Sequence, residues 1–322
     1  MNKEVIETTL HLLANSPEWE ERYAGYIKYL VKKQPKRFRA PMGLSVYSSV
    51  SRHKGGTYDL RFDGQSVGII SSRPKKVKLY PREKANETYF GFHLKETGFD
   101  WGNSDEAKKF RKFFRDKAKG SSDIKLKSPE HRVENRLLKE FAKRTRVEDK
   151  ALTGIQPIKL NGCFFQLPTP IKASDHNPKY AKQSGGGIDI LSRVKRKNGK
   201  SRLCVMEVKD ENKPKESQSA AMEQALTYAT FIAKLLRSEF GQKWWDFLMG
   251  RDTTSSPVPK ALDIDVVTIM PSEPKTEEFV NEIIPISEVN ATFHCHSLYY
   301  DDNEFKNGRF VFSGTYPELL MK

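Results

Sequence analysis

The chain has 322 residues, which allows two domains, and its formal net charge of +15 at pH 7 favours a polyanionic partner. No long apolar segment and no signal peptide are visible, so the sequence predicts no membrane-spanning segment and no membrane partner. The three cysteines, Cys163, Cys204 and Cys295, are odd in number and far apart. They argue against a disulfide framework and for a reducing compartment, so a cytoplasmic protein is expected.

The N-terminal part of the chain predicts an α+β domain over residues 1–120. Residues 1–32 carry the apolar stripes of helices, with one break. Short apolar runs then fill residues 43–98, where Asp63-Gly64 has the composition of a hairpin turn. A basic helix is expected at about 104–118, followed by a linker that contains glycine and serine. This domain matches no motif, and a role in DNA recognition or in assembly stays open.

The basic helix has an apolar side that would dock it on its domain. Phe110, Phe113 and Phe114 lie on that side, which leaves the basic residues facing solvent. These residues are the expected DNA contacts outside the catalytic part: Lys108, Lys109, Arg111, Lys112 and Arg115. A merely solvated surface is the alternative.

Residues 128–322 predict a second domain in the order helix, three strands, helix and strand. Ser128 suits the N-cap of the first helix and Pro129 its first position. The strands are expected at 158–167, 185–191 and 203–209, the second helix at about 217–237 and the last strand at 262–270. The tail, 275–322, is expected to add a short helix and a hairpin that pairs 293–299 with 309–313.

Charged residues interrupt two of these apolar strands. Asp189 lies in the strand expected at 185–191. Glu207 and Lys209 lie in the strand expected at 203–209, where alternation places both on one face. A carboxylate in an apolar strand is costly to bury unless it is paired or bound to a metal. One acid beside an acid–x–lysine is what metal-assisted phosphodiester hydrolysis requires. The carboxylates hold a divalent cation, and the lysine places the attacking water.

The turn between the two strands decides whether these charges meet. Lys197-Asn198-Gly199-Lys200 is a hairpin signal that can close in two ways. A two-residue turn would pair Asp189 with Val208, on the wrong face. A three-residue loop with a bulge at Gly199 would pair Asp189 with Glu207. A real site therefore predicts the bulged loop.

Over about residues 128–272, this pattern resembles the PD-(D/E)XK nuclease superfamily. The resemblance implies an α/β restriction-endonuclease-like domain with a mixed sheet, in which the first helix often presents a glutamate to the metal. Glu134 lies on the apolar stripe of that helix and is the better candidate, with His131 as the alternative. The sequence departs from the family at Gly187-Ile188, which replaces the proline before the aspartate.

The second helix carries a further point of resemblance. Gln224 and Tyr228 are similar to the QxxxY motif of the RecB-like branch, and residues four apart are neighbours on one helix face. Both flank the apolar stripe of the helix. This placement suits side chains at the rim of a cleft that touch the phosphate backbone or hold the lysine.

The resemblance implies a magnesium-dependent deoxyribonuclease, with Mn²⁺ as a substitute and DNA as the partner. The endonuclease of a restriction or defence system is the favoured setting. The expected metal ligands are Asp189, Glu207, the backbone carbonyl of Val208, and Glu134. Lys209 is expected to orient the water and to stabilise charge on the phosphate. The basic hairpin adds expected DNA contacts at Lys195, Arg196 and Lys197.

Two other functions stay open on the sequence. The QxxxY motif favours a RecB-like exonuclease in DNA repair. Alternatively, the fold could serve as a non-enzymatic DNA-binding or scaffold protein whose acids form ion pairs. A second copy of the chain or a partner subunit also stays open. His294-Cys295-His296 suggests zinc, but no second ligand pair stands at the usual spacing, so an ordinary strand is favoured.

Overall fold

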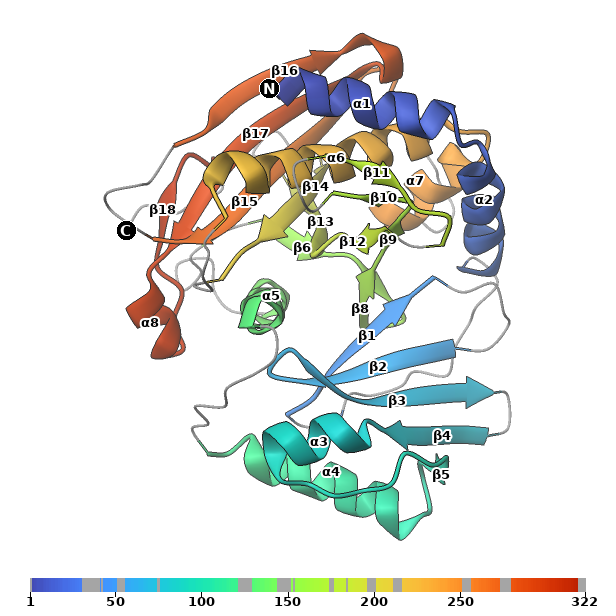
Figure 1. The fold of residues 1–322 in the computed structure, drawn as a ribbon, viewed down its shortest axis with the longest axis vertical. Coiled ribbons are helices and arrows are strands. Elements are labelled where there is room, and N and C mark those ends of the chain that lie inside the picture. Colours follow the sequence, from blue (N-terminus) through green and yellow to red (C-terminus); the bar gives the residue numbers. More distant parts are fainter. Residues whose placement is uncertain are drawn as a thin grey trace. The chain divides into compact units, whose positions relative to one another are not determined.

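The computed structural model of the chain is a mixed α/β structure with two seven-stranded sheets (Figure 1). It describes residues 2–30, 41, 43–50, 56–73, 76–120, 129–143, 152, 154–173, 177–183, 185–195, 201–210, 216–250, 256–272 and 279–317. The chain forms two compact units. The first unit contains residues 1–27, 139–158 and 167–322, and the second contains 28–138 and 159–166. The expected mixture of helices and mixed sheets is therefore confirmed.

The second unit is built on a sheet with the strand order β5-β4-β3-β2-β1-β8-β7. Its strands are β1 (Ser45–Ser49), β2 (Gly56–Phe62), β3 (Gln65–Arg73), β4 (Lys76–Pro81), β5 (Phe99–Asp100), β7 (Lys159–Leu160) and β8 (Cys163–Gln166). Its helices are α3 (Glu83–Phe90), α4 (Asp105–Lys117) and most of α5 (Pro129–Ala142). Neighbouring strands are antiparallel except β1 and β8, which are parallel.

An aromatic core joins α3 and α4 to one face of this sheet. Phe110 and Phe114 of α4 are fully buried, with ring centroids 4.8 Å apart, and Phe90 of α3 lies 5.5 Å from Phe114. Leu60 and Ile70 supply the sheet side of the same core. The sequence prediction of the basic helix is confirmed, because its phenylalanine side docks it on the sheet.

A hairpin that the sequence analysis missed gives the second unit its last two strands. The predicted strand at 158–167 is divided at Asn161-Gly162, where both residues have positive φ angles, 58° and 84°. This conformation is that of a two-residue hairpin turn, and Asn-Gly is its preferred sequence. β7 and β8 therefore pair with each other in the second unit's sheet. The neighbour of β13 is instead the short strand β6 (Ile155–Pro157).

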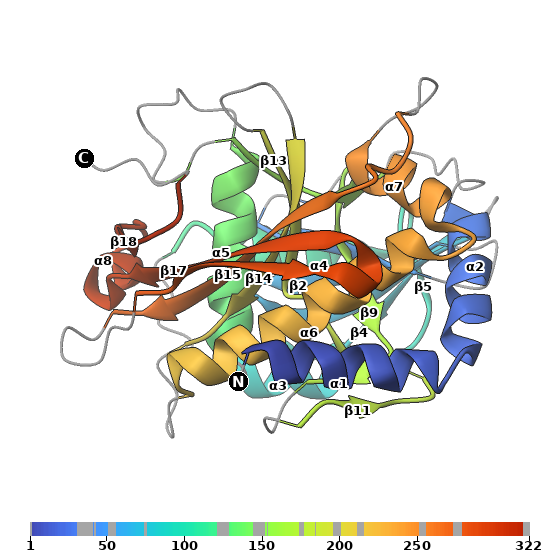
Figure 2. The ribbon, with the colours of Figure 1, turned by 90° about the horizontal axis from the view of Figure 1, so that it is seen from above.

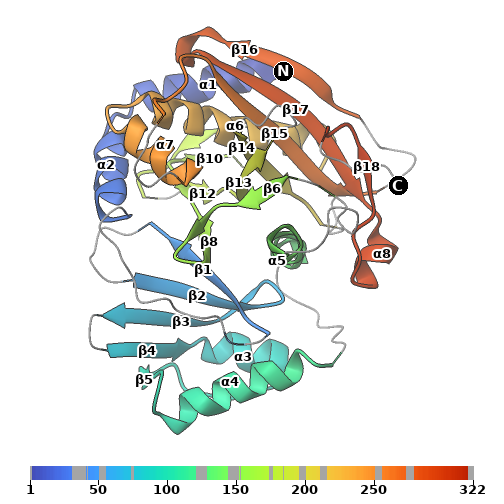
Figure 3. The same cartoon turned by 180° about the vertical axis from the view of Figure 1, so that it is seen from behind.

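The first unit is built on a mixed sheet with the order β16-β17-β15-β14-β13-β6, and β18 pairs with β17 (Figure 3). The further strands are β13 (Ile190–Lys195), β14 (Ser201–Val208), β15 (Leu262–Pro271), β16 (Asn281–Ile286), β17 (Ala291–Tyr300) and β18 (Phe312–Gly314). β6, β13 and β14 form an antiparallel meander, whereas β14, β15 and β17 are parallel. The central strands are buried, as parallel strands usually are.

Helices and short strands complete this unit. The helices are α1 (Asn2–Ala14), α2 (Glu18–Leu30, to residue 27 in this unit), α6 (Gln218–Arg237), α7 (Gly241–Met249), the 3-10 turn η2 (Ser287–Val289) and α8 (Asp302–Lys306). Short pairs join β9 (Pro168–Thr169) to β12 (Gly186–Gly187) and β10 (Ile171–Lys172) to β11 (Lys179–Tyr180). The predicted tail hairpin, 293–299 with 309–313, is displaced in the structure: residues 298–300 pair with 312–314, with α8 between them, and residues 291–296 pair with β16.

The N-terminal helices belong to the first unit, so the two units do not follow the predicted boundary between 1–120 and 128–322. α1 runs along α6 in both Figures 1 and 2. Trp19 of α2 is fully buried and lies edge-on to Phe231 of α6, with centroids 5.7 Å apart. Tyr23 lies 4.9 Å from the same ring. The apolar stripes that predict these helices contain no information about which distant helix they meet.

Two local findings bear on earlier expectations. All three cysteines are buried and none is joined by a disulfide. Residues 294–296 lie in β17, where His294 pairs with Asp263 at 2.7 Å, so the expected ordinary strand is confirmed. Among the helices in the described part of the chain, none combines the length and the apolar character that crossing a bilayer requires.

Replacing Trp19 with alanine tests the assignment of the N-terminal helices to the first unit. The change removes a fully buried indole whose N–H donates to the Leu13 carbonyl at 3.0 Å. We expect the free energy of unfolding, measured by urea denaturation, to fall by about 3–5 kcal/mol. The exposed Glu7→Ala change in α1 is the control and should stay within about 0.5 kcal/mol of the unchanged chain. An equally small effect of Trp19→Ala would contradict the packing.

Candidate active site

The register between β13 and β14 brings Asp189 and Glu207 together. Ile190 pairs with Met206 and Lys195 with Ser201, and the same register continued by one residue aligns Asp189 with Glu207. This is the register that the bulged loop predicts and that a two-residue turn would not give. The loop itself, 196–200, lies outside the described residues.

Asp189 sits at a bend just before β13 rather than inside a strand. One of its carboxylate oxygens, Oδ2, accepts a hydrogen bond from the backbone N–H of Val208 at 2.9 Å. This bond fixes the Asp189 side chain against the end of β14, beside Glu207.

The glycines before Asp189 allow a close approach of neighbouring chain. A Cβ added to Gly185 would lie 2.2 Å from the Ile171 backbone, and one added to Gly186 would lie 2.9 Å from the Tyr228 hydroxyl. Neither position has room for a side chain. The glycine run thus brings the chain that leads to Asp189 against the hydroxyl end of Tyr228, which is one of the predicted site residues.

Lys209 follows β14 and is held by three acceptors. Its Nζ lies 2.8 Å from Glu207 Oε1, 2.8 Å from Glu216 Oε2 and 2.9 Å from Gln224 Oε1. The side chain of Lys209 is only 12% exposed and that of Glu207 is 5% exposed. Contacts this short in a largely buried setting are stronger than surface ion pairs. The predicted relation of Gln224 to the lysine is thereby present in the structure.

Glu216 is a member of this cluster that sequence reasoning missed. It immediately precedes Ser217, whose side chain caps α6 by accepting from the Ala220 N–H. Glu216 Oε1 accepts from Gln224 Nε2 at 2.8 Å, so one carboxylate bridges the amide and the ammonium. The signal in the sequence was an acid placed just before a helix cap, which alone is too common to single out.

A polar row crosses the sheet next to Glu207. Glu207 pairs with Thr268 of β15, which in turn pairs with Ser297 of β17, and directly opposite residues share one face. Thr268 and Ser297 are fully buried, and Thr268 Oγ1 accepts from Gln218 of α6 at 2.6 Å. The site therefore lies between the sheet and α6. Its described side chains include the Lys209 ammonium with the carboxylates of Glu207 and Glu216 against it, and the Asp189 carboxylate bonded to the end of β14.

The carboxylate and amide oxygens of this cluster are donors of the type that hard divalent cations prefer. Within the described residues, no group of three or more His, Cys, Asp or Glu side chains has the arrangement of a formed metal site. The metal ligation predicted for Asp189, Glu207, Val208 and Glu134 therefore stays a prediction.

Glu134 belongs to the second unit and has partners there. It is buried, and its carboxylate lies 3.7 Å from Arg61 Nη1 and accepts from Gln166 Nε2 at 3.1 Å. Burial alone would lower the pKa of the Arg61 guanidinium, but Glu134, Tyr47 and Asp59 together raise it. This charge pair gives Glu134 a structural role, and its predicted contribution to a metal stays a prediction.

The predicted basic contacts differ in how exposed they are. Lys108, Lys109, Lys112 and Arg115 of α4 are exposed, as is Lys195 of β13. Arg111 is partly buried and donates to the carbonyl of Trp101, with its guanidinium over the indole. Lys108 and Lys112 form surface ion pairs with Asp105 and Asp116. Arg196 and Lys197 lie outside the described residues.

No protein-family model, no curated protein and no solved structure matches this chain.

A double-mutant cycle tests the link between Lys209 and Glu216. We expect Lys209→Met and Glu216→Ala to show a coupling of about 0.5–1 kcal/mol in the free energy of unfolding. The value is small because the Glu216 side chain is 37% exposed and solvent screens its charge. The control is the cycle of Lys209→Met with Glu239→Ala. Glu239 is exposed and lies just after the C-terminus of α6, so this cycle should give no coupling. Equal coupling in both cycles would contradict the contact.

Proposed function

We propose that the protein is a metal-dependent deoxyribonuclease that hydrolyses DNA phosphodiester bonds, with its catalytic centre in the first unit. The observation that carries the proposal is the alignment of Asp189 with Glu207 beside a lysine that Glu207 and Gln224 hold. The element order β6, β13, β14, α6, β15 supports a restriction-endonuclease-like fold for this unit, since β15 runs parallel to β14 after an antiparallel meander. Magnesium is the proposed cation, with manganese as a substitute.

The carboxylates of Asp189 and Glu207 and the carbonyl of Val208, all in the first unit, would hold the cation. The bound cation would supply Lewis-acid activation of the scissile phosphate and its attacking water. The chain contributes the rigid placement of these oxygens. The Val208 N–H fixes Asp189, and the strand register fixes Glu207, so the donors are in place before substrate arrives.

Lys209 contributes a positive charge at the end of β14, and one of its three N–H donors would leave its protein acceptor to meet the attacking water. It orients the attacking water and stabilises the negative charge that develops on the phosphate. Gln224 and Glu216 hold the ammonium in position, and Tyr300 also fixes the strand end by donating to the Lys209 carbonyl at 3.2 Å. Tyr228, one turn after Gln224, lies beside the glycine run and is proposed to contact the phosphate backbone or to order the site.

Substitutions at the cluster test the catalytic proposal. Asp189→Asn, Glu207→Ala and Lys209→Ala are each expected to lower magnesium-dependent cleavage of plasmid DNA at least about 100-fold, because each removes a donor or charge used in the transition state. DNA affinity should stay within about tenfold, since the basic surface provides most of the binding. Asp263→Asn is the matched control, because Asp263 lies on β15 and pairs with His294 instead. Wild-type cleavage by Glu207→Ala would refute the assignment.

Metal binding can be measured without cleavage. Calcium is expected to raise the melting temperature of the unchanged chain and of Asp263→Asn, because a ligand that binds only the folded state stabilises it. Asp189→Asn and Glu207→Ala should lose this shift. Equal shifts in all four proteins would place the calcium elsewhere.

A RecB-like exonuclease is the second candidate, favoured by the contact between Gln224 and the lysine. Circular and linear DNA separate the two activities, because an exonuclease needs an end. The scaffold alternative is favoured by the mutual ion pairs of Lys209 with Glu207 and Glu216. A chain that binds DNA but cleaves neither substrate with magnesium or manganese would support that alternative. A restriction or defence setting is the proposed biological context.

The basic side of α4 is the proposed DNA contact outside the catalytic centre. Replacing Lys108, Lys112 and Arg115 with glutamine should lower the slope of log affinity against log salt by up to about 0.9 for each phosphate that the variant no longer neutralises. The decrease in slope should be smaller than the value for three phosphate contacts, because Asp105 and Asp116 already neutralise part of this surface. The melting temperature should change little, since all three side chains are exposed. An unchanged slope would remove α4 from the interface.

A further inference from the structure

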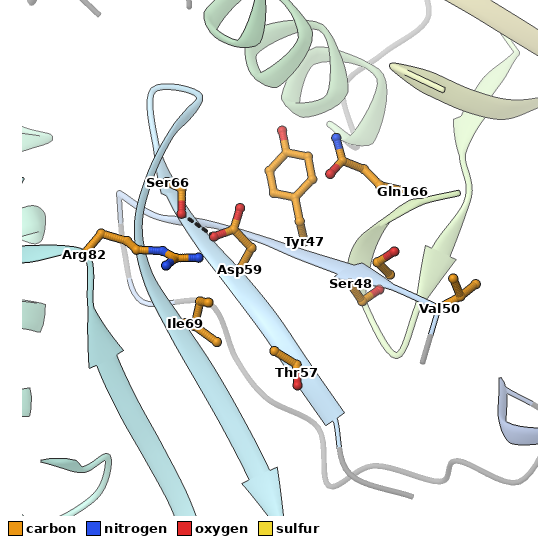
Figure 4. A pocket seen from close by; sticks show the side chains of 10 residues that line it. Tyr47, Ser48, Val50, Thr57, Asp59, Ser66, Ile69, Arg82 and Gln166 are labelled. Atoms are coloured by element: carbon orange, nitrogen blue, oxygen red, sulfur yellow. Dashed lines mark hydrogen bonds between the residues drawn. The ribbon is translucent and has the colours of Figure 1, made fainter. Parts of the chain in front are cut away.

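The second unit contains a hollow of about 400 Å³ on one face of its sheet (Figure 4). Tyr47, Asp59 and Ile69 line it as a row across β1, β2 and β3, because Tyr47 pairs with Asp59 and Asp59 with Ile69. Directly opposite residues share one face of a sheet. The size is within the range of small-ligand sites. The hollow involves none of the proposed catalytic residues of the first unit.

A network of hydrogen bonds fixes the polar wall of the hollow. Asp59 accepts from Ser66 Oγ at 2.5 Å and from Arg61 Nε at 2.7 Å. Arg61 also donates to Gln166 at 2.9 Å, and Gln166 donates to Glu134 at 3.1 Å. Such a connected network holds its members in one arrangement, so a ligand that meets Asp59 and Gln166 finds them already ordered.

Tyr47 forms a buried part of the wall and supports Arg61. The Arg61 guanidinium lies 4.1 Å from the centre of its ring, and its hydroxyl accepts from Asn135 Nδ2 at 2.8 Å. Burial raises the pKa of Tyr47 well above its usual value, so this ring stays neutral. Ile69, which is partly exposed, offers apolar surface beside the Asp59 carboxylate.

The charged groups of the hollow select the chemistry of a ligand. Asp59 accepts two hydrogen bonds, and an ionised carboxylate has about four acceptor sites, so it can take further donors such as an amino group. Figure 4 shows the Arg82 guanidinium directed toward Asp59 and Ser66. Arg82 is 42% exposed and pairs with the 50% exposed Glu96 only at 3.4 Å, a weak surface pair that an anion can displace.

We propose that this hollow binds a nucleotide whose base carries an exocyclic amino group, such as cytosine. The base lies in the hollow with its amino group donating to Asp59, and the phosphate lies at Arg82. Carboxylates accept from the cytosine amino group in known base recognition. An unstacked base in a DNA strand and a free nucleotide share this chemistry. The DNA form of the proposal rests on the proposed nuclease function, whereas the nucleotide form does not.

The test measures binding of dCMP and dTMP by saturation-transfer NMR and of dC and dT decamers by fluorescence anisotropy, all in EDTA to prevent cleavage. The variants are Ile69→Trp, which fills the hollow, and Arg82→Gln, which removes the cation. Lys78→Gln is the control, because Lys78 is an exposed cation on the neighbouring strand β4 and does not line the hollow. Circular dichroism melting verifies that each variant is folded.

We expect dC ligands to bind more tightly than dT ligands, and Ile69→Trp to weaken dC binding at least about tenfold. Arg82→Gln should weaken the binding of both dC and dT ligands, and Lys78→Gln should weaken the binding of neither. Binding of the dC decamer without dCMP would assign the hollow to bases in a strand, and binding of both would assign it to nucleotides in general. Equal binding of dC and dT, or binding unaffected by folded Ile69→Trp, would overturn the proposal.

The same experiment separates this proposal from the nuclease proposal. Asp189→Asn changes only the catalytic centre and should bind dC ligands as the unchanged chain does. If the unchanged chain cleaves no DNA but loses dC binding on Ile69→Trp, the hollow is a nucleotide site on a protein that is not a nuclease. If the unchanged chain cleaves DNA and the Ile69→Trp variant binds dC ligands equally well, the nuclease proposal stands and the hollow has no role in recognition.

Discussion

The pairing of β13 with β14 determines where the charged groups of the candidate site lie. Side chains alternate along a strand, so a register shift of one residue would place Asp189 on the opposite face of the sheet from Glu207. The observed register keeps Asp189 bonded to the end of β14 and directs Glu207 and Lys209 toward α6. Gln224 and Glu216 then meet the lysine because α6 packs on that face. The cluster depends on this one alignment more than on any single contact within it.

The sequence was sufficient where the relevant geometry is local. Alternation along a strand relates Glu207 to Lys209, helical spacing relates Gln224 to Tyr228, and the choice between two turn lengths relates Asp189 to Glu207. The structure confirms that register and the contact between Gln224 and Lys209. The division at Asn161-Gly162 was also readable, since this dipeptide is the preferred hairpin turn, but the apolar run around it concealed the break.

The sequence was insufficient where partners are distant and their chemistry is common. Glu216 is one of many acids, and its role follows only from the position of α6 relative to β14. Glu134 was noticed as an acid on an apolar stripe, but its observed partners, Arg61 and Gln166, lie on strands far away in sequence. A buried acid requires a partner, and the pattern states that requirement without saying whether an arginine or a metal meets it.

The packing of α1 against α6 has a consequence for how the protein is made. The helices α1 and α2 leave the ribosome before α6 does, yet Trp19 and Tyr23 of α2 have an aromatic partner in Phe231 of α6. At about 5–20 residues per second, translation takes roughly 10–40 s to pass from Trp19 to Phe231. The sheet of the second unit cannot be completed until β8 is made, because β8 pairs with β1 across more than 100 residues. At the same rate, β8 is synthesised on the order of 5–20 s after β1. Exposed apolar helix faces during that interval are surfaces that chaperones bind, so the order of the elements along the chain links the stability of the folded protein to protection while it is synthesised.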